Sequence, residues 1–201
     1  MAKNKCNHNR LINALCIVFF LIVLFWAFRW IQYYRYTSGK MSYEALTEFW
    51  KEGTYKRYSE HIPTKAYPKG WTESGTTVVK RNDNLYDVNI ISNTVRVIPD
   101  KKNISLTHTY VFNYSPFTNQ VRVNFKNTIG SHAHTAVKQI DKNTIVMYSE
   151  SYDSESIGKE NIMNLCYFHK TKDGYYSDEY HSPNYGLTWH PWWNATYTRL
   201  S

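Results

Sequence analysis

The feature that most constrains this chain is an apolar run near its N-terminus. The 18 residues from Leu11 to Phe28 carry no charge, and Asn13 is their only clearly polar member. As an α-helix the run would be about 27 Å long, close to the ~30 Å hydrocarbon core of a bilayer. Aromatic residues of the kind found at membrane interfaces flank its C-terminal side: Trp26, Trp30, Tyr33 and Tyr34. We predict a transmembrane helix over residues 11–31, anchored by these side chains.

A cleaved signal peptide would share the basic start and the apolar run. This run, however, exceeds the usual signal-peptide core, and Phe28 to Tyr33 lack the small residues of a cleavage site. We therefore expect the segment to be retained. Basic residues flank it on both sides, so its orientation depends mainly on the short N-terminal stretch, which favours an N-terminus in the cytoplasm.

These inferences divide the chain into four parts. We expect a cytoplasmic tail (residues 1–10), the transmembrane helix (11–31), a juxtamembrane linker (32–40) and an extracytoplasmic β-rich domain (41–201). The protein would be a single-pass protein of the cell (inner) membrane.

The net charge of +8 belongs largely to the surroundings of the apolar run. Five basic residues lie before residue 36, which leaves 19 basic against 16 acidic residues in the rest of the chain. Because no long basic run occurs there, a nucleic-acid partner is not expected. Cys166 is the only cysteine of the predicted domain, so no disulfide can form within it, and this favours a bacterial envelope protein.

The domain has an alternating pattern that is typical of β-strands. Residues 41–52 first predict a short amphipathic helix, because their apolar side chains recur at helical spacing. Beyond Thr76 the period becomes two, as in Ile104–Tyr114 and Val121–Phe125, and turn residues such as those at 115–119 separate the alternating runs. Val95 and Val97 likewise alternate with Arg96, which predicts buried valines and an exposed arginine. The pattern predicts a mainly β fold: an antiparallel meander of seven or eight strands, folded as a lipocalin-like barrel or a sandwich.

Two histidines at alternating positions, His132 and His134, are the candidates for a metal site. The residues after them lack the carboxylate of a cupin-like pattern, so we favour exposed or hydrogen-bonded histidines and predict no metal and no other cofactor. Cys166 lies in an apolar strand context, where a thiol is usually a core residue. We therefore predict no catalytic residue and a protein that is not an enzyme.

Aromatic residues are unusually frequent, with 18 Tyr, 7 Trp and 9 Phe. Several must fill the core, but aromatic rings also form platforms for an amphiphilic ligand or a partner protein. For the C-terminal group the alternatives are a structural lid and a binding surface. The candidate ligand-binding or partner-binding residues are Tyr110, Tyr185, Trp189, Trp192 and Trp193.

These features favour a non-enzymatic binding, sensor or accessory protein that pairs with another membrane protein as a hetero-oligomer and binds a small amphiphilic ligand. The layout of anchor, linker and β-domain resembles that of the small single-pass partners of bacterial membrane-bound transcription regulators, which implies a signalling accessory with its domain in the periplasm. The alternatives are a structural component of a secretion or conjugation assembly and, with less support, a zinc enzyme that uses the histidines.

Overall fold

The computed structural model describes residues 2–64, 67–153 and 162–200, which form two compact units. The first ends at Arg35 and consists of most of helix α1 (Ala2–Thr37). By length and composition, α1 is long and apolar enough to cross a membrane. It extends beyond the predicted span of 11–31 in both directions, because no glycine or proline interrupts the chain before Gly39. The predicted linker, residues 32–40, is therefore helical as far as Thr37.

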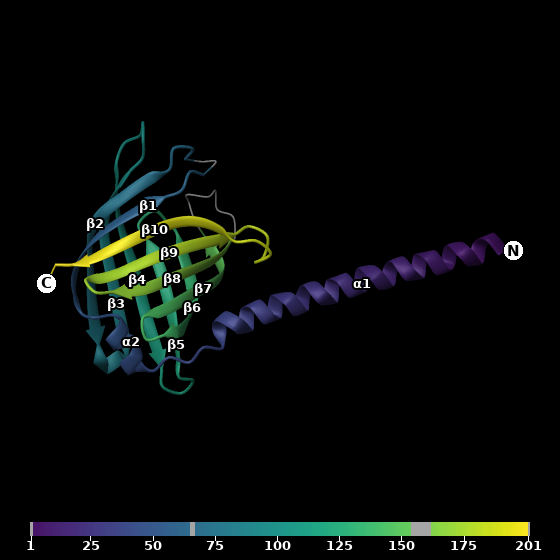
Figure 1. The fold of residues 1–201 in the computed structure, drawn as a ribbon, viewed down its shortest axis with the longest axis horizontal. Helices are drawn as coiled ribbons and strands as arrows, with labels where there is room; N and C mark the ends of the chain where they lie inside the picture. The colour runs from purple at the N-terminus through teal and green to yellow at the C-terminus, as the bar shows by residue number, and fades with distance from the viewer. Residues whose placement is uncertain (1, 65–66, 154–161, 201) are drawn as a thin grey trace. The chain divides into compact units, whose positions relative to one another are not determined.

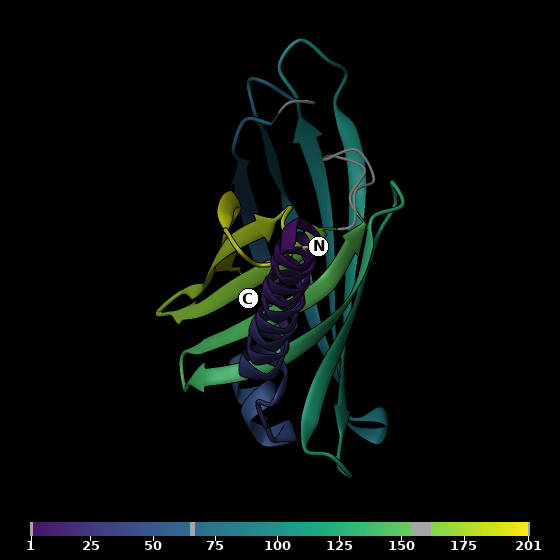
Figure 2. The same ribbon diagram turned by 90° about the vertical axis from the view of Figure 1, so that its right-hand side faces the viewer.

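The second unit is a closed barrel of antiparallel strands in sequence order (Figure 1, Figure 2). Its strands are β1 (Gly53–His61), β2 (Trp71–Asn82), β3 (Asp87–Val97), β4 (Ile104–Ser115), β5 (Gln120–Asn127), β6 (His132–Asp141), β7 (Thr144–Asp153), β8 (Ile162–Thr171), β9 (Gly174–Ser182) and β10 (His190–Arg199). A single turn of 3-10 helix, η1 (Asp83–Leu85), joins β2 to β3. The first and last strands close the barrel, with pairs from Tyr55↔Arg199 to His61↔Trp193.

The predicted mainly β meander is confirmed, and of the two architectures considered the chain adopts the barrel. The expected number of seven or eight strands was too low, because β1, the start of β2 and β10 were not recognised. In β1 the inward positions after Tyr55 are Arg57 and Ser59, both buried. Polar inward residues hide the alternation of apolar and polar side chains by which strands are recognised.

Helix α2 (Tyr43–Phe49) closes the end of the barrel at which β1 begins, and we call this the helix end. Ser42 caps the helix, its hydroxyl accepting a hydrogen bond from the Ala45 amide at 3.1 Å. Leu46, Phe49 and the following Trp50 are buried in the barrel core. The amphipathic helix predicted within residues 41–52 is therefore present, and its apolar side faces the interior.

The opposite end, which we call the loop end, carries the connections between β1 and β2, β3 and β4, β5 and β6, β7 and β8, and β9 and β10. A separate apolar cluster covers the outer surface of β7 and β8, where the Tyr36 ring stacks on Tyr148 with 5.2 Å between centroids. The last residues of α1 thus belong to the barrel unit, and Tyr36 and Thr37 are buried.

We expect Phe49→Ala to lower the free energy of unfolding by about 3–5 kcal/mol, because it leaves a cavity in the core at the helix end. Urea unfolding of the full chain in detergent, followed by tryptophan fluorescence, measures this. Glu48→Ala, on the exposed side of α2, is the matched control and should change stability by less than about 0.5 kcal/mol. Equal losses of stability in the two variants would contradict the packing of α2 into the barrel core.

Candidate functional site

A group of charged and imidazole side chains is buried inside the barrel towards the loop end. We call it the Glu73 cluster: Arg57, His61, Glu73, Arg96 and His108, from strands β1 to β4. Neighbouring strands bring these residues together, since Ser59 pairs with Glu73 and Glu73 with Arg96. Arg57, Glu73 and Arg96 are at most 4% exposed. A set of charges this deeply buried is unusual and requires internal pairing.

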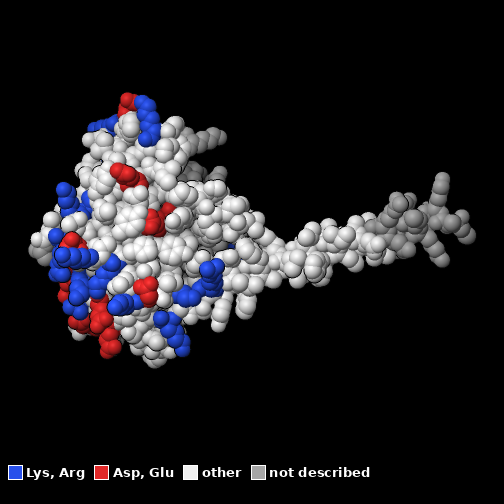
Figure 3. Space-filling model, viewed as in Figure 1, with Lys and Arg blue, Asp and Glu red and all other residues white. Residues whose placement is uncertain are grey.

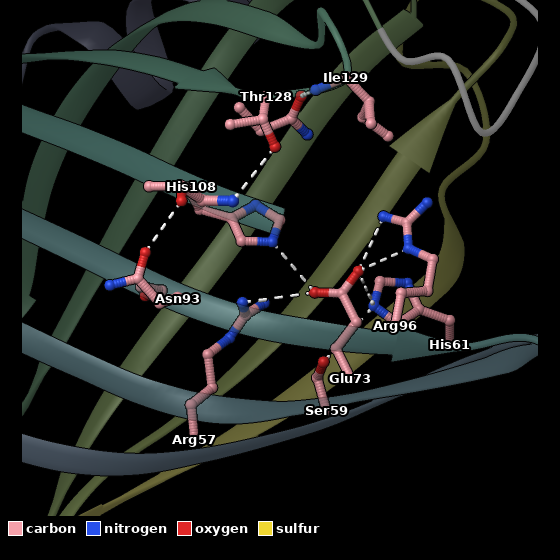
Figure 4. A network of polar contacts seen from close by, with 12 residues as sticks. Arg57, Ser59, His61, Glu73, Asn93, Arg96, His108, Thr128 and Ile129 are labelled. Carbon is pink, nitrogen blue, oxygen red and sulfur yellow. Dashed lines mark hydrogen bonds and ion pairs between the residues drawn. The ribbon is translucent and has the colours of Figure 1, made fainter. Parts of the chain in front are cut away.

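The carboxylate of Glu73 is the centre of the cluster (Figure 4). Its Oε1 accepts hydrogen bonds from Nε and Nη2 of Arg96 at 2.8 and 2.7 Å. Its Oε2 lies 3.1 Å from Nε2 of His108 and 3.4 Å from Nη1 of Arg57. Because an ionised carboxylate only accepts, Nε2 of His108 carries the proton of this hydrogen bond. The single carboxylate of Glu73 therefore lies at ion-pair distance from two guanidinium groups.

The cluster fixes the charge of its members. Burial would raise the pKa of Glu73, but the hydrogen bond from His108 and the positive charges of Arg57 and Arg96 hold it well below its usual value. Burial lowers the pKa of His61 to about 3, and it also lowers the pKa of His108. At neutral pH the cluster thus contains two cations, one anion and two neutral imidazoles.

A second buried carboxyl group, Glu179 on β9, behaves in the opposite way. Burial raises its pKa from the ordinary value of 4.5 to about 8, although the hydrogen bond from Asn164 works against this. Cys166, beside it, has a pKa raised well above the usual value, mainly by burial. Glu179 is therefore largely protonated at neutral pH and does not balance the excess positive charge of the Glu73 cluster.

Two small cavities lie next to these groups. One, lined by Arg57, His61, Glu73 and Trp193 among others, leaves about 30 Å³ for the centres of water-sized molecules, and the other, beside Glu179, leaves about 20 Å³. The rings of Tyr110 and Phe125 line both. Since one water needs roughly 10–15 Å³ by this measure, each cavity has room for one or two small molecules and not for a large amphiphile.

The five predicted aromatic residues lie in different environments. Tyr110 lines the cavities, and Trp193 stacks on His61 with 5.6 Å between ring centroids. Trp192 is buried in the core, Trp189 packs half-buried against the outer cluster on β7 and β8, and Tyr185 is 60% exposed. The structure brings Tyr110, Trp192 and Trp193 to the cavity at the charged site, and a binding role for any of the five stays a prediction.

His132 and His134 are exposed on β6. Nδ1 of His134 lies 2.6 Å from Oδ1 of Asn124, and Nδ1 of His132 lies 3.3 Å from the Gly130 carbonyl oxygen. Among the described residues, no group of three or more His, Cys, Asp and Glu side chains is arranged to hold a metal ion. In α1 the predicted anchor residues Trp26, Trp30, Tyr33 and Tyr34 are exposed, and the rings of Trp30 and Tyr34 stack.

The Glu73 cluster is not apparent from the sequence pattern. Val95 and Val97 look buried in the sequence and Arg96 exposed, but the structure has the reverse: the two valines are 40% and 43% exposed and Arg96 is 4% exposed. The one available signal was His108, because it shares the apolar face of the 104–114 pattern with Leu106, Tyr110 and Phe112. A polar residue on a buried face requires a partner inside the barrel.

No family model matches this chain, and no curated protein does. Among solved structures it is similar to a de novo designed fluorescence-activating β-barrel, at 10% identity over 76% of this chain and 96% of that chain, with a TM-score of 0.35. This similarity is too distant to support an argument about function.

On the face of the barrel in view, basic and acidic side chains are intermingled (Figure 3).

The shifted pKa values predict a maximum of stability near pH 6.5. Between pH 4.5 and 8 Glu179 is protonated in the folded protein and ionised in the unfolded chain, so stability falls as the pH rises by up to about 1.4 kcal/mol per pH unit. His61 and His108 act oppositely below about pH 6.5. Burial lowers the pKa of both imidazoles, so they bind a proton in the unfolded chain and not in the folded one, and together they outweigh Glu179 there.

We expect the free energy of unfolding to fall by about 1 kcal/mol from pH 6.5 to 8, and Glu179→Gln to abolish this decline. The glutamine keeps an oxygen that can accept the hydrogen bond from Asn164. Urea titrations of both proteins at each pH provide the test. A decline of the same size in the variant would show that another group causes it.

Proposed function

We propose that this protein is a membrane-anchored, non-enzymatic accessory protein whose barrel binds another membrane protein through the outer face of β2, β3 and β4. Lys80 and Asp87 project outward from β2 and β3 near the helix end, and the observation that carries the proposal is the absence of charge over the part of this face nearer the loop end. This part comprises the outward side chains at positions 72, 74, 76 and 78 of β2, 91, 93, 95 and 97 of β3, and 105, 107, 109 and 111 of β4.

Apart from Asn93, this part of the face consists of β-branched aliphatic and hydroxyl side chains. Its aliphatic members are Val78, Ile91, Val95, Val97 and Val111, of which Ile91, Val95 and Val97 are 39–43% exposed. Val78 pairs with Ile91 across β2 and β3, so these apolar side chains are neighbours. The core of a protein interface is depleted of charged residues in the same way.

Charged residues border this face on both sides. Lys56 and Glu60 project from β1, and Arg122 and Lys126 from β5. An apolar centre with a polar rim is the usual anatomy of a protein interface. The comparable apolar surface on β7 and β8 is covered by Tyr36, whereas Ile91, Val95 and Val97 stay exposed on the barrel unit.

The anchor supports a partner within the same membrane. Helix α1 can cross a bilayer by length and composition, and the domain follows it without a long spacer. With the N-terminus in the cytoplasm the barrel is extracytoplasmic, as the sequence favours. Restriction of both proteins to one surface raises their effective concentration, so a weak interface suffices.

Site-specific photo-crosslinking in the cells that make the protein tests the proposal. A photoreactive residue in place of Ile91 or Val95 should yield one discrete crosslinked product that contains a different membrane protein. The same residue in place of Arg122, on the charged border, is the matched control and should yield little of it. Mass spectrometry identifies the partner.

A charge on the face gives the second half of the test. In a protein with the photoreactive residue at Ile91, Val95→Lys should reduce the product at least about tenfold, because it places an unpaired charge in the interface, while the fold remains intact. A product that contains only a second copy of this chain would indicate a self-assembling structural component. Equal crosslinking from Ile91 and Arg122 would refute the assignment of the face.

A further inference from the structure

Arg57 is a buried cation that its protein neighbours do not fully satisfy. The nearest carboxylate, Glu73, already accepts two hydrogen bonds from Arg96 and one from His108. Nη1 of Arg57 lies within ion-pair distance of Glu73, at 3.4 Å, but makes no hydrogen bond there. Among the described residues, neither Nε nor Nη1 of Arg57 has a hydrogen-bond partner. A guanidinium group that is only 2% exposed requires such partners.

The immediate surroundings of Arg57 leave its charge unbalanced. Its guanidinium carbon lies 5.7 Å from the centre of the Trp193 ring and 5.9 Å from that of Tyr197. Aromatic faces attract a cation, and Tyr197 also forms a side-chain hydrogen bond with Arg57, but neither provides a full negative charge. Glu179, the other buried carboxyl group of the described interior, is engaged by Asn164 and is largely protonated at neutral pH.

A cavity of suitable size adjoins the guanidinium group. It leaves about 30 Å³ for the centres of water-sized molecules and is lined by Arg57, His61, Asn127 and Ser131 among others. Nδ1 of His61 is also buried without a hydrogen-bond partner in the described part of the chain. The neutral imidazole can donate its one hydrogen bond into the cavity in the tautomer that carries the proton on Nδ1, while Nε2 accepts.

We propose that the interior of the barrel binds one small monovalent anion, a halide or the carboxylate of a one- or two-carbon acid, against Arg57 and His61. Its charge balances the second guanidinium group, and its size is limited by the cavity. Sulfate and phosphate are excluded, because they are larger and because a second negative charge would face Glu73. This site lies inside the barrel and goes beyond the proposed partner-binding face.

Thermal unfolding of the full chain in detergent at constant ionic strength tests the site. Sodium gluconate, whose anion is too large for the cavity, is replaced stepwise by sodium chloride, bromide or formate, and separately by sulfate. We expect a saturable rise in Tm of about 3–6 °C at ten times the Kd for the first three anions and no saturable rise for sulfate.

Arg57→Gln should abolish the saturable rise. The control is Arg81→Gln, because Arg81 forms a surface ion pair with Glu52 in which both side chains are more than a third exposed, and this variant should respond as the wild type does. A rise that persists in Arg57→Gln, or one that sulfate produces equally, would overturn the proposal.

A measurement on the wild type keeps the test decisive if Arg57→Gln does not fold. Bromide quenches tryptophan fluorescence on contact, and the Trp193 ring lines the cavity beside Arg57. We expect a saturable component of quenching that formate reverses by competition. Quenching that is linear in bromide and insensitive to formate would refute the site. Neither outcome depends on a partner protein, so failure here leaves the partner-binding proposal untouched.

Discussion

The pairing of β1 with β10 is the constraint on which the rest of the domain depends. By closing the sheet it removes both free edges, which would otherwise offer unpaired backbone groups to other chains. Closure also creates an interior that must be filled, and the two ends of the barrel are filled differently. At the helix end, α2 inserts Leu46, Phe49 and Trp50 between the strands. Towards the loop end the interior is polar, and Glu73 holds Arg96 and His108 around it.

Burial of the polar half of the interior carries a free-energy cost of desolvation that burial of the apolar half does not. Removing charges from water is expensive, and a buried ion pair repays this only when its hydrogen bonds are complete. Arg96 and Glu73 meet that condition, whereas Arg57 does not. A buried group that is not satisfied by its own chain is a common sign of a ligand or a solvent molecule. The placement of Arg57 beside a cavity therefore suggests that the interior is specialised for something besides stability.

The outside of the barrel is also divided. Tyr36 covers the apolar surface on β7 and β8, so that patch contributes to the fold. On the outward surface of β2, β3 and β4, by contrast, Ile91, Val95 and Val97 are exposed and have no role in the core. Surfaces of this kind on soluble domains usually belong to interfaces. The interior site and the outer face are thus physically separate, and each can be altered without the other.

Local periodicity along the chain is enough to predict the apolar helix, the β-meander, the short amphipathic helix and the inward side of β4. It placed Arg96 on the wrong side of β3, since valines on both sides made it look exposed. Strands β1 and β10 were also not predicted. The inward positions of β1 include Arg57 and Ser59, and the pairing of β1 with β10 joins opposite ends of the domain sequence. Only the tertiary structure could decide these points, because a buried charge is tolerated only where distant strands supply its partners. The alternation of apolar and polar residues along one strand does not show which partners the distant strands supply.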